Sequence, residues 1–154
     1  MIKLIDLLNE GKQVGLLYHW TNSESLLNIL NNNILQATYG DYGKTTHKSI
    51  SGPSISFTRS SNRYSFPIAE DADCVLVLDG DKLSNNYKII PYSEQDAEFD
   101  EMEERIYNKD IIDLNKYIIK VIMYEDNKHV FGEDTWNECI NTLKEKNIPY
   151  EIVK

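Results

Sequence analysis

The chain has 154 residues, 41% of them hydrophobic, and a net charge of −9 at neutral pH. These values are typical of one globular domain with its own core and exclude a disordered chain. No apolar run approaches the roughly 20 residues that a membrane-spanning helix needs. The opening segment carries Asp6 and Glu10 and does not resemble a secretory signal. We therefore expect a single domain over residues 1–154 that stays in the cytoplasm and has no membrane partner.

The pattern of hydrophobic residues predicts an α+β domain, because several short strands accompany few helices. An amphipathic helix is expected over residues 2–10, a core over 15–124, and a helix and a strand within 133–153. The strands expected within the core lie at residues 15–19, 34–37, 54–58, 74–78, 87–90 and 116–124. A polar, glycine-containing loop at residues 38–53 is expected to lie near the functional site.

A helix is predicted directly after the first strand. The segment from Thr21 to Glu24 has the form of a capping box, with Thr21 as the cap. The helix then presents Leu26 and Leu30 on one face, and it ends at asparagines that tolerate the left-handed conformation. Cys74 and Cys139 lack the spacing of a metal site, so buried free thiols are expected, with a disulfide as the alternative.

Two charged clusters each have two interpretations. The basic one is either a solvated face or a phosphate-binding surface, although the net negative charge disfavours bulk attraction to nucleic acid. Its members are Lys44, His47, Lys48, Arg59 and Arg63. Residues 94–104 carry seven carboxylates, which indicates a solvated face. Divalent-cation binding is the alternative, but the loop pattern of a calcium site is missing, so no metal is expected.

Three segments combine chemically useful residues with a recognisable spacing. In the first, His19 closes a strand and is followed by Trp20 and Thr21. In the second, Ser61 stands three residues before Tyr64, just after a strand.

In the third segment, Glu104 precedes a strand that begins near Tyr117, about a dozen residues further on. Glu101 and Glu103 are alternatives to Glu104, because together they form a paired-glutamate pattern. The family described next has its glutamate about a dozen residues before such a strand, and this spacing favours Glu104 over the two alternatives.

The order and spacing of the three segments resemble the ADP-ribosyltransferase superfamily, in its diphtheria-toxin and poly(ADP-ribose) polymerase branch. The resemblance covers roughly residues 15–124. It implies two small antiparallel sheets packed face to face, a central cleft that binds NAD, and flanking helices. It also implies that His19, Tyr64 and Glu104 form the catalytic set. Where the family has a glycine, this chain has Trp20, whose side chain either points into the core or forms a wall of the site.

The chemistry of NAD cleavage suits these residue types. A glutamate such as Glu104 stabilises the oxocarbenium-like ribose. The ring of Tyr64 stacks on nicotinamide, and His19 positions the ribose hydroxyls. Among the remaining NAD-binding candidates, Trp20 offers backbone groups and Ser61 holds the carboxamide.

Two further residues complete the expected NAD site. Arg59 meets the pyrophosphate. Thr21 either contacts the nucleotide or only caps the helix. Taken singly, each candidate in the site also has a structural explanation, so the prediction depends on the whole set.

The sequence therefore predicts a mono-ADP-ribosyltransferase that uses NAD as its substrate. A protein acceptor is expected rather than a nucleic acid, because the net charge is −9. Its small size is typical of a phage or bacterial effector, active in the cytoplasm of a bacterium or an infected host cell. Two alternatives stay open: an NAD glycohydrolase with the same residues, and a non-catalytic interaction protein with the same fold.

Overall fold

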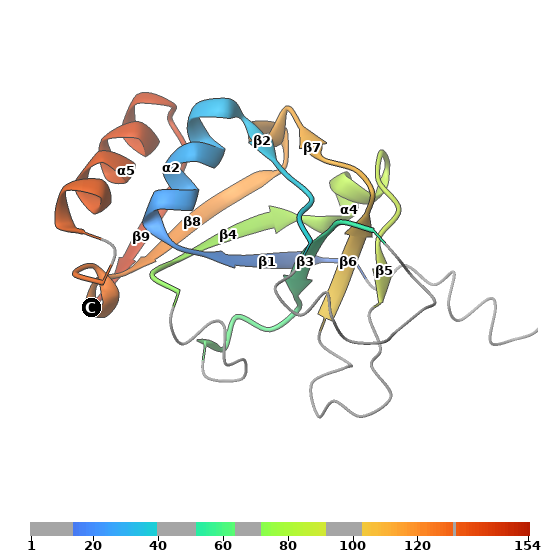
Figure 1. Cartoon of the computed structure of the whole chain (residues 1–154), viewed down its shortest axis with the longest axis horizontal. Helices are drawn as coiled ribbons and strands as arrows, with labels where there is room; N and C mark the ends of the chain where they lie inside the picture. Colours follow the sequence, from blue (N-terminus) through green and yellow to red (C-terminus); the bar gives the residue numbers. More distant parts are fainter. Residues whose placement is uncertain (1–13, 40–51, 64–71, 92–102, 131) are drawn as a thin grey trace, which may run out of the picture.

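The computed structural model describes residues 14–39, 52–63, 72–91, 103–130 and 132–154 and confirms the α+β class (Figure 1). The helix expected over residues 2–10 lies outside these ranges. The strands are β1 (Leu16–Thr21), β2 (Ile34–Leu35), β3 (Ser54–Thr58), β4 (Cys74–Asp79), β5 (Ile90–Pro91), β6 (Glu103–Tyr107), β7 (Ile111–Ile112), β8 (Ile118–Tyr124) and β9 (Tyr150–Val153). The helices are α2 (Ser23–Asn32), α4 (Gly80–Ser84), α5 (Glu133–Glu145) and the short 3-10 turns η3 (Leu114–Lys116) and η4 (Glu125–Asn127).

Seven strands form one sheet in the order β5-β6-β3-β1-β4-β8-β9. Neighbouring strands of this sheet pair antiparallel, except β8 and β9. These two are parallel, because α5 carries the chain back between them. β2 and β7 form a separate antiparallel pair. Within the described residues, the arrangement thus differs from the expected two small antiparallel sheets packed face to face. The cause is that β1 and β3 pair and join their strands into one mixed sheet.

The contact between β1 and β3 is narrow. Within the described residues their register consists of a single pair, Tyr18 opposite Thr58. By contrast, β1 pairs with β4 over six positions, and β3 pairs with β6 over five. Figure 1 shows β3 and β6 running across the direction of β1 and β4. The large sheet therefore has two halves, β5-β6-β3 and β1-β4-β8-β9, which meet at one point.

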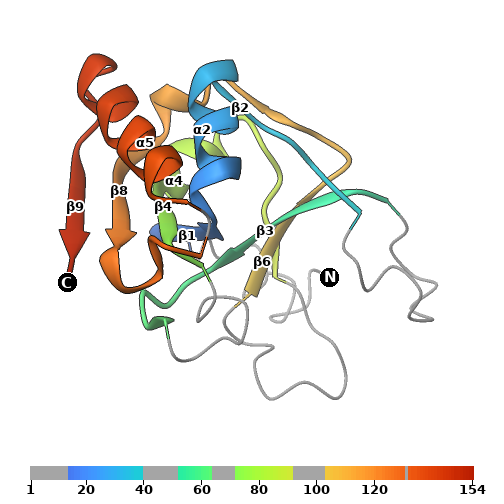
Figure 2. The ribbon, with the colours of Figure 1, turned by 60° about the vertical axis from the view of Figure 1, so that its left-hand side comes forward.

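α2 and α5 lie side by side over one face of the β1-β4-β8-β9 half (Figure 2). α2 contributes Leu26 and Leu30 to the core, and α5 contributes Trp136, Cys139 and Leu143. Both sets recur at helical spacing, and this spacing is what predicted the two helices. Among the described residues, no helix is long and apolar enough to cross a membrane.

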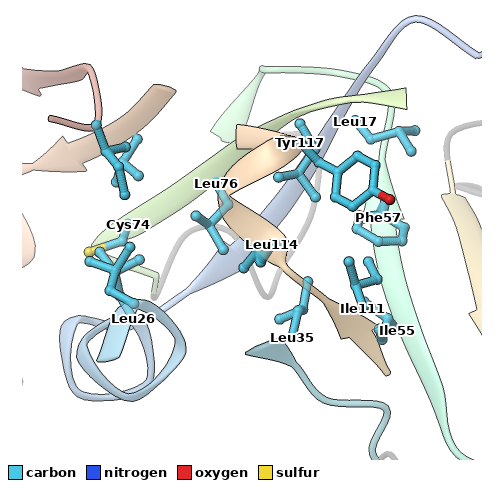
Figure 3. Close-up of a cluster of buried hydrophobic side chains, with 14 of the residues drawn as sticks. Leu17, Leu26, Leu35, Ile55, Phe57, Cys74, Leu76, Ile111, Leu114 and Tyr117 are labelled. Atoms are coloured by element: carbon cyan, nitrogen blue, oxygen red, sulfur yellow. The ribbon is translucent and has the colours of Figure 1, made fainter. Parts of the chain in front are cut away.

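The main core fills the space between these helices and the sheet (Figure 3). Leu17, Phe57 and Leu76 of the central strands are each about 1% exposed or less. Burying a side chain of this kind contributes about 1.5–3 kcal/mol. Because strand residues alternate between faces, His19 lies on the same core-facing side as Leu17. Trp20 lies on the reverse face, in a second and smaller buried cluster.

Several predicted boundaries differ from the structure by one or two residues, and the strand expected at 87–90 is present only as Ile90–Pro91. Asn22, rather than Thr21, caps α2, and its Oδ1 accepts a hydrogen bond of 2.8 Å from the backbone N–H of Ser25. The last core strand begins at Ile118, because Asp113 adopts a positive φ of 51° and a 3-10 turn precedes the strand.

Buried polar groups gather where α2 begins. Cys74 and Cys139 are buried free thiols, as predicted. The Sγ of Cys139 donates to the backbone carbonyl of Ser23 at 3.0 Å. Asp73 is completely buried beside Ser23 and Cys74, and within the described residues neither of its carboxylate oxygens accepts a hydrogen bond of good geometry. A buried carboxylate that is poorly paired destabilises the fold.

Candidate active site

His19 is half-buried in β1. Its Nδ1 donates a hydrogen bond of 2.9 Å to the backbone carbonyl of Ser56, and its ring meets Phe57 edge to face with centroids 6.0 Å apart. Burial lowers the pKa of His19, and the bond to Ser56 opposes this effect without reversing it. The ring is therefore neutral at physiological pH. Because a carbonyl only accepts, Nδ1 carries the proton and Nε2 can accept a hydrogen bond from a hydroxyl.

Glu104 lies in β6, two strands away from His19. The register sets Glu104 opposite Phe57. Residues paired in this way project from the same face of a sheet. Next to the single β1–β3 pair, the ring of His19 contacts that of Phe57, so these two side chains lie on one face. His19, Phe57 and Glu104 therefore form a row across β1, β3 and β6, and Glu104 is only 3% exposed.

Arg59 follows the end of β3 and forms an ion pair with Glu104, through Nη2 and Oε1. The arginine side chain is 27% exposed and the glutamate side chain 4%. Burial lowers the pKa of Arg59, but a guanidinium stays charged in proteins. The structure thus joins two predicted site residues, although the sequence indicated no contact between them. The predicted contact of Arg59 with a pyrophosphate stays a prediction.

Trp20 faces away from His19. Its Nε1 donates to the Oγ1 of Thr58 at 2.9 Å, and its ring stacks on Tyr124 with centroids 6.0 Å apart. Of the two positions considered for its side chain, the buried one is correct, and the indole does not crowd His19. Thr21 ends β1 opposite Cys74 and does not cap the helix.

The remaining NAD-site candidates lie apart from the row or outside the described residues. Ser61 is exposed and lines a hollow of about 280 Å³ together with Arg63 and Tyr124. Neither His19 nor Glu104 lines this hollow. Tyr64 lies outside the described residues.

The alternatives considered for the acidic and basic residues are partly settled. Glu101 lies outside the described residues, and the register sets Glu103 opposite Thr58, one position off the row that contains Glu104. Within the basic cluster, Arg59 and Arg63 are each paired with a carboxylate. Its other members lie outside the described residues, namely Lys44, His47 and Lys48.

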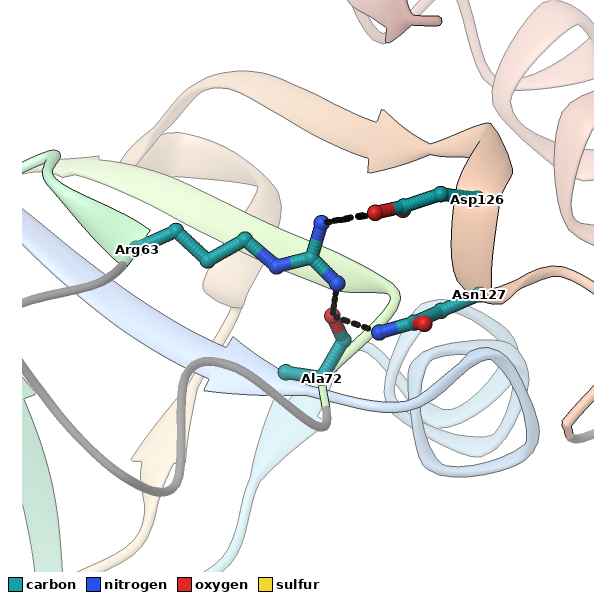
Figure 4. Close-up of polar contacts among 4 residues, drawn as sticks. All are labelled: Arg63, Ala72, Asp126 and Asn127. Atoms are coloured by element: carbon teal, nitrogen blue, oxygen red, sulfur yellow. Dashed lines mark hydrogen bonds and ion pairs between the residues drawn. The ribbon is translucent and has the colours of Figure 1, made fainter.

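The sequence did not reveal what Arg63 does. This residue is 6% exposed, and its Nη1 lies 2.9 Å from both carboxylate oxygens of Asp126. Its Nη2 donates to the backbone carbonyl of Ala72 at 3.1 Å. The same carbonyl also accepts a hydrogen bond from the side chain of Asn127 (Figure 4). The guanidinium carbon lies 4.5 Å from the centre of the Tyr124 ring. Asp126 is 63 residues away along the chain, so no local sequence pattern predicts its ion pair with Arg63.

No protein-family model and no curated protein matches this chain. A functional assignment therefore depends on the site residues. The row offers a hydrogen-bond acceptor on His19, an apolar surface on Phe57 and a buried carboxylate on Glu104 with Arg59 beside it.

Proposed function

We propose that the protein is a mono-ADP-ribosyltransferase, which takes ADP-ribose from NAD and attaches it to a macromolecular acceptor. The row of His19, Phe57 and Glu104 is the observation that supports this most. We further propose that the nicotinamide riboside end of NAD binds beside this row, where β1 and β3 separate. The domain would then share the NAD-binding arrangement of the ADP-ribosyltransferases.

Glu104 is proposed to stabilise the transition state. When the bond between ribose C1′ and the nicotinamide nitrogen breaks, its electron pair leaves with nicotinamide and positive charge develops on the ribose. A carboxylate opposes such charge more strongly in a low-dielectric place than in water. The side chain of Glu104 meets this condition because it is 4% exposed. A buried ion pair contributes little to stability. A role in catalysis therefore explains the Arg59–Glu104 pair better than a role in stability does.

The other residues are proposed to position NAD. Nε2 of His19 accepts a hydrogen bond from a ribose hydroxyl, while Nδ1 stays on Ser56. Arg59, which pairs with Glu104, contributes its positive charge to binding the pyrophosphate. Tyr64 stacks on the nicotinamide ring. Ser61 has no part in this proposal, because it lines the hollow that lies apart from the row.

The acceptor supplies the nucleophile, which bonds to C1′ and loses a proton to solvent. A protein acceptor fits the net charge of −9 better than a nucleic acid. We propose that the transferase acts as a phage or bacterial effector, in the cytoplasm of a bacterium or an infected host cell.

Labelled NAD tests the proposal directly. Purified protein, biotinylated NAD and bacterial lysate should give a labelled acceptor band. Glu104→Gln should lower the labelling rate by about 100-fold or more, because a charged group facing the developing cation is lost. Glu138→Gln is the matched control, since Glu138 is exposed on α5, and it should label like the wild type.

The other outcomes separate the alternatives. Equal labelling by Glu104→Gln and the wild type would show that the carboxylate is misassigned. Rapid release of free ADP-ribose without lysate would replace transfer by NAD hydrolysis. A wild-type protein that neither labels an acceptor nor shows a thermal shift with NAD would be a non-catalytic binding protein. Thermal melting of Glu104→Gln excludes simple unfolding as the cause of lost labelling.

A further inference from the structure

The reverse face of the sheet carries a connected set of contacts that ends on the segment next to the site. Arg63 is 6% exposed and contacts groups from several parts of the chain. It pairs with Asp126 through Nη1, donates from Nη2 to the Ala72 carbonyl, and lies over the ring of Tyr124 (Figure 4). These contacts point in different directions, so they fix the guanidinium in position and in orientation.

Trp20 holds the other end of the same segment. Its indole N–H donates to Thr58 Oγ1 at 2.9 Å, and this hydroxyl in turn donates to the Ser60 carbonyl at 3.0 Å. The indole also stacks on Tyr124 with an interplanar angle of 22°. Tyr124 is therefore a shared support for Trp20 and for Arg63.

Residues 59–62 run between these two anchors. The segment is also turned tightly, because the N–H of Asn62 donates to the Oγ of Ser60 at 3.0 Å. Arg59, its first residue, reaches the opposite face of the sheet and pairs with Glu104. The backbone that carries Arg59 is thus held by contacts on the reverse face of the sheet, whereas Glu104 lies on the core-facing side.

We propose that Arg63 and Trp20 are positioning residues, which fix residues 59–62 from the reverse face and thereby set Arg59 against Glu104. The consequence for catalysis rests on the proposed transferase function. The consequence for the position of Arg59 does not, because it concerns the protein without NAD.

The form of the Arg63 contacts favours positioning over stabilisation. Asp126 is 58% exposed, and an ion pair with an exposed partner adds little to stability. What arginine adds is a flat guanidinium that stacks on a ring and donates along fixed directions. A lysine keeps the positive charge, but its ammonium group is not planar and does not donate along fixed, parallel directions. Arg63→Lys therefore separates charge from geometry.

The mobility of Arg59 provides the first test. ¹⁵N relaxation of its Nε–H gives an order parameter, which reports whether the side chain is held rigidly. Arg63→Lys and Trp20→Phe should each lower this order parameter while the protein stays folded. Lys120→Ala is the matched control, because it removes the Lys120–Glu151 ion pair between β8 and β9, away from residues 59–62. An unchanged order parameter in folded Arg63→Lys and Trp20→Phe overturns the proposal.

The labelling assay provides the second test. Arg63→Lys should lower kcat by about 10- to 100-fold, with a smaller change in the KM for NAD, as expected when catalytic groups shift by about 1 Å. Lys120→Ala should keep the wild-type kcat. If the wild type labels no acceptor while Arg63→Lys still mobilises Arg59, the proposed function fails and the positioning role stands. A kcat that falls only in proportion to the unfolded fraction means that Arg63 is merely structural.

Discussion

Replacing Asp73 with asparagine should stabilise the protein at neutral and alkaline pH. Asp73 is completely buried, and within the described residues neither carboxylate oxygen accepts a hydrogen bond of good geometry. Desolvation raises its pKa, and hydrogen bonding by the adjacent Ser23 and Cys74 lowers it only in part. Asparagine has nearly the same shape and carries no charge. It can also donate to the Ser23 hydroxyl beside it.

The raised pKa sets the direction of the pH dependence. Below about pH 3.9, the aspartate is protonated in both the folded and the unfolded state, so it makes no difference to stability. As the pH rises, the unfolded state loses this proton first, and the wild type loses stability until the folded group also ionises. The advantage of Asp73→Asn should therefore be absent near pH 4 and largest near pH 8.

The size of the effect follows from the burial of a poorly paired polar group, which costs about 1–3 kcal/mol. Since 1 kcal/mol shifts Tm by about 2–4 °C in a chain of this size, Asp73→Asn should melt about 2–12 °C higher at pH 8. Urea unfolding between pH 4 and 8.5 measures the free energy directly. Glu138→Gln, on the exposed face of α5, should stay within about 0.5 kcal/mol of the wild type throughout. A less stable Asp73→Asn at pH 8, or a difference that does not shrink toward pH 4, would refute the reasoning.

Two further predictions concern His19 and the thiols. Because burial lowers the pKa of His19 below its usual value, its ring is mainly neutral at about pH 7.5 and above, and NAD affinity by calorimetry should be constant from about pH 7.5 to 8.5. His19→Gln should weaken NAD binding by about 5- to 10-fold, the loss of one hydrogen bond of about 1 kcal/mol, and unchanged affinity would exclude a ribose contact. Burial raises the pKa of both thiols, that of Cys139 to about 12. Neither Cys74 nor Cys139 should therefore react with a thiol reagent in the native protein at pH 8, and both should react after unfolding, whereas rapid native labelling would contradict their burial.

Local patterns predicted the elements that have a clear apolar side. The alternation in Ser54–Thr58 and the helical spacing of Trp136, Cys139 and Leu143 fall inside β3 and α5 as the structure has them. β6 was harder to predict from pattern alone, because Glu104 takes the buried place where an apolar residue would normally mark the strand. No strand was therefore predicted at Glu103–Tyr107 from the apolar pattern.

The row itself was beyond local inspection. His19, Phe57 and Glu104 are brought together by pairing between strands that are far apart in the sequence. For Trp20 a local pattern does exist, because alternation along β1 places it on the face opposite His19. The contact of Arg63 with Asp126 had no such signal, because it joins the segment after β3 to a turn near the end of β8.

The single pair of Tyr18 and Thr58 also decides how easily the sheet can change shape. Altering the angle between the two halves disturbs the backbone hydrogen bonds of that pair and the side-chain bonds of His19 with Ser56 and of Trp20 with Thr58. Each such bond contributes about 0.5–1.5 kcal/mol. Separating strands within a half would break six pairs between β1 and β4, or five between β3 and β6. The sheet is therefore stiff within each half and more easily deformed where β1 meets β3. A ligand that moves β1 and β3 apart would spend only a small part of its binding free energy on this deformation.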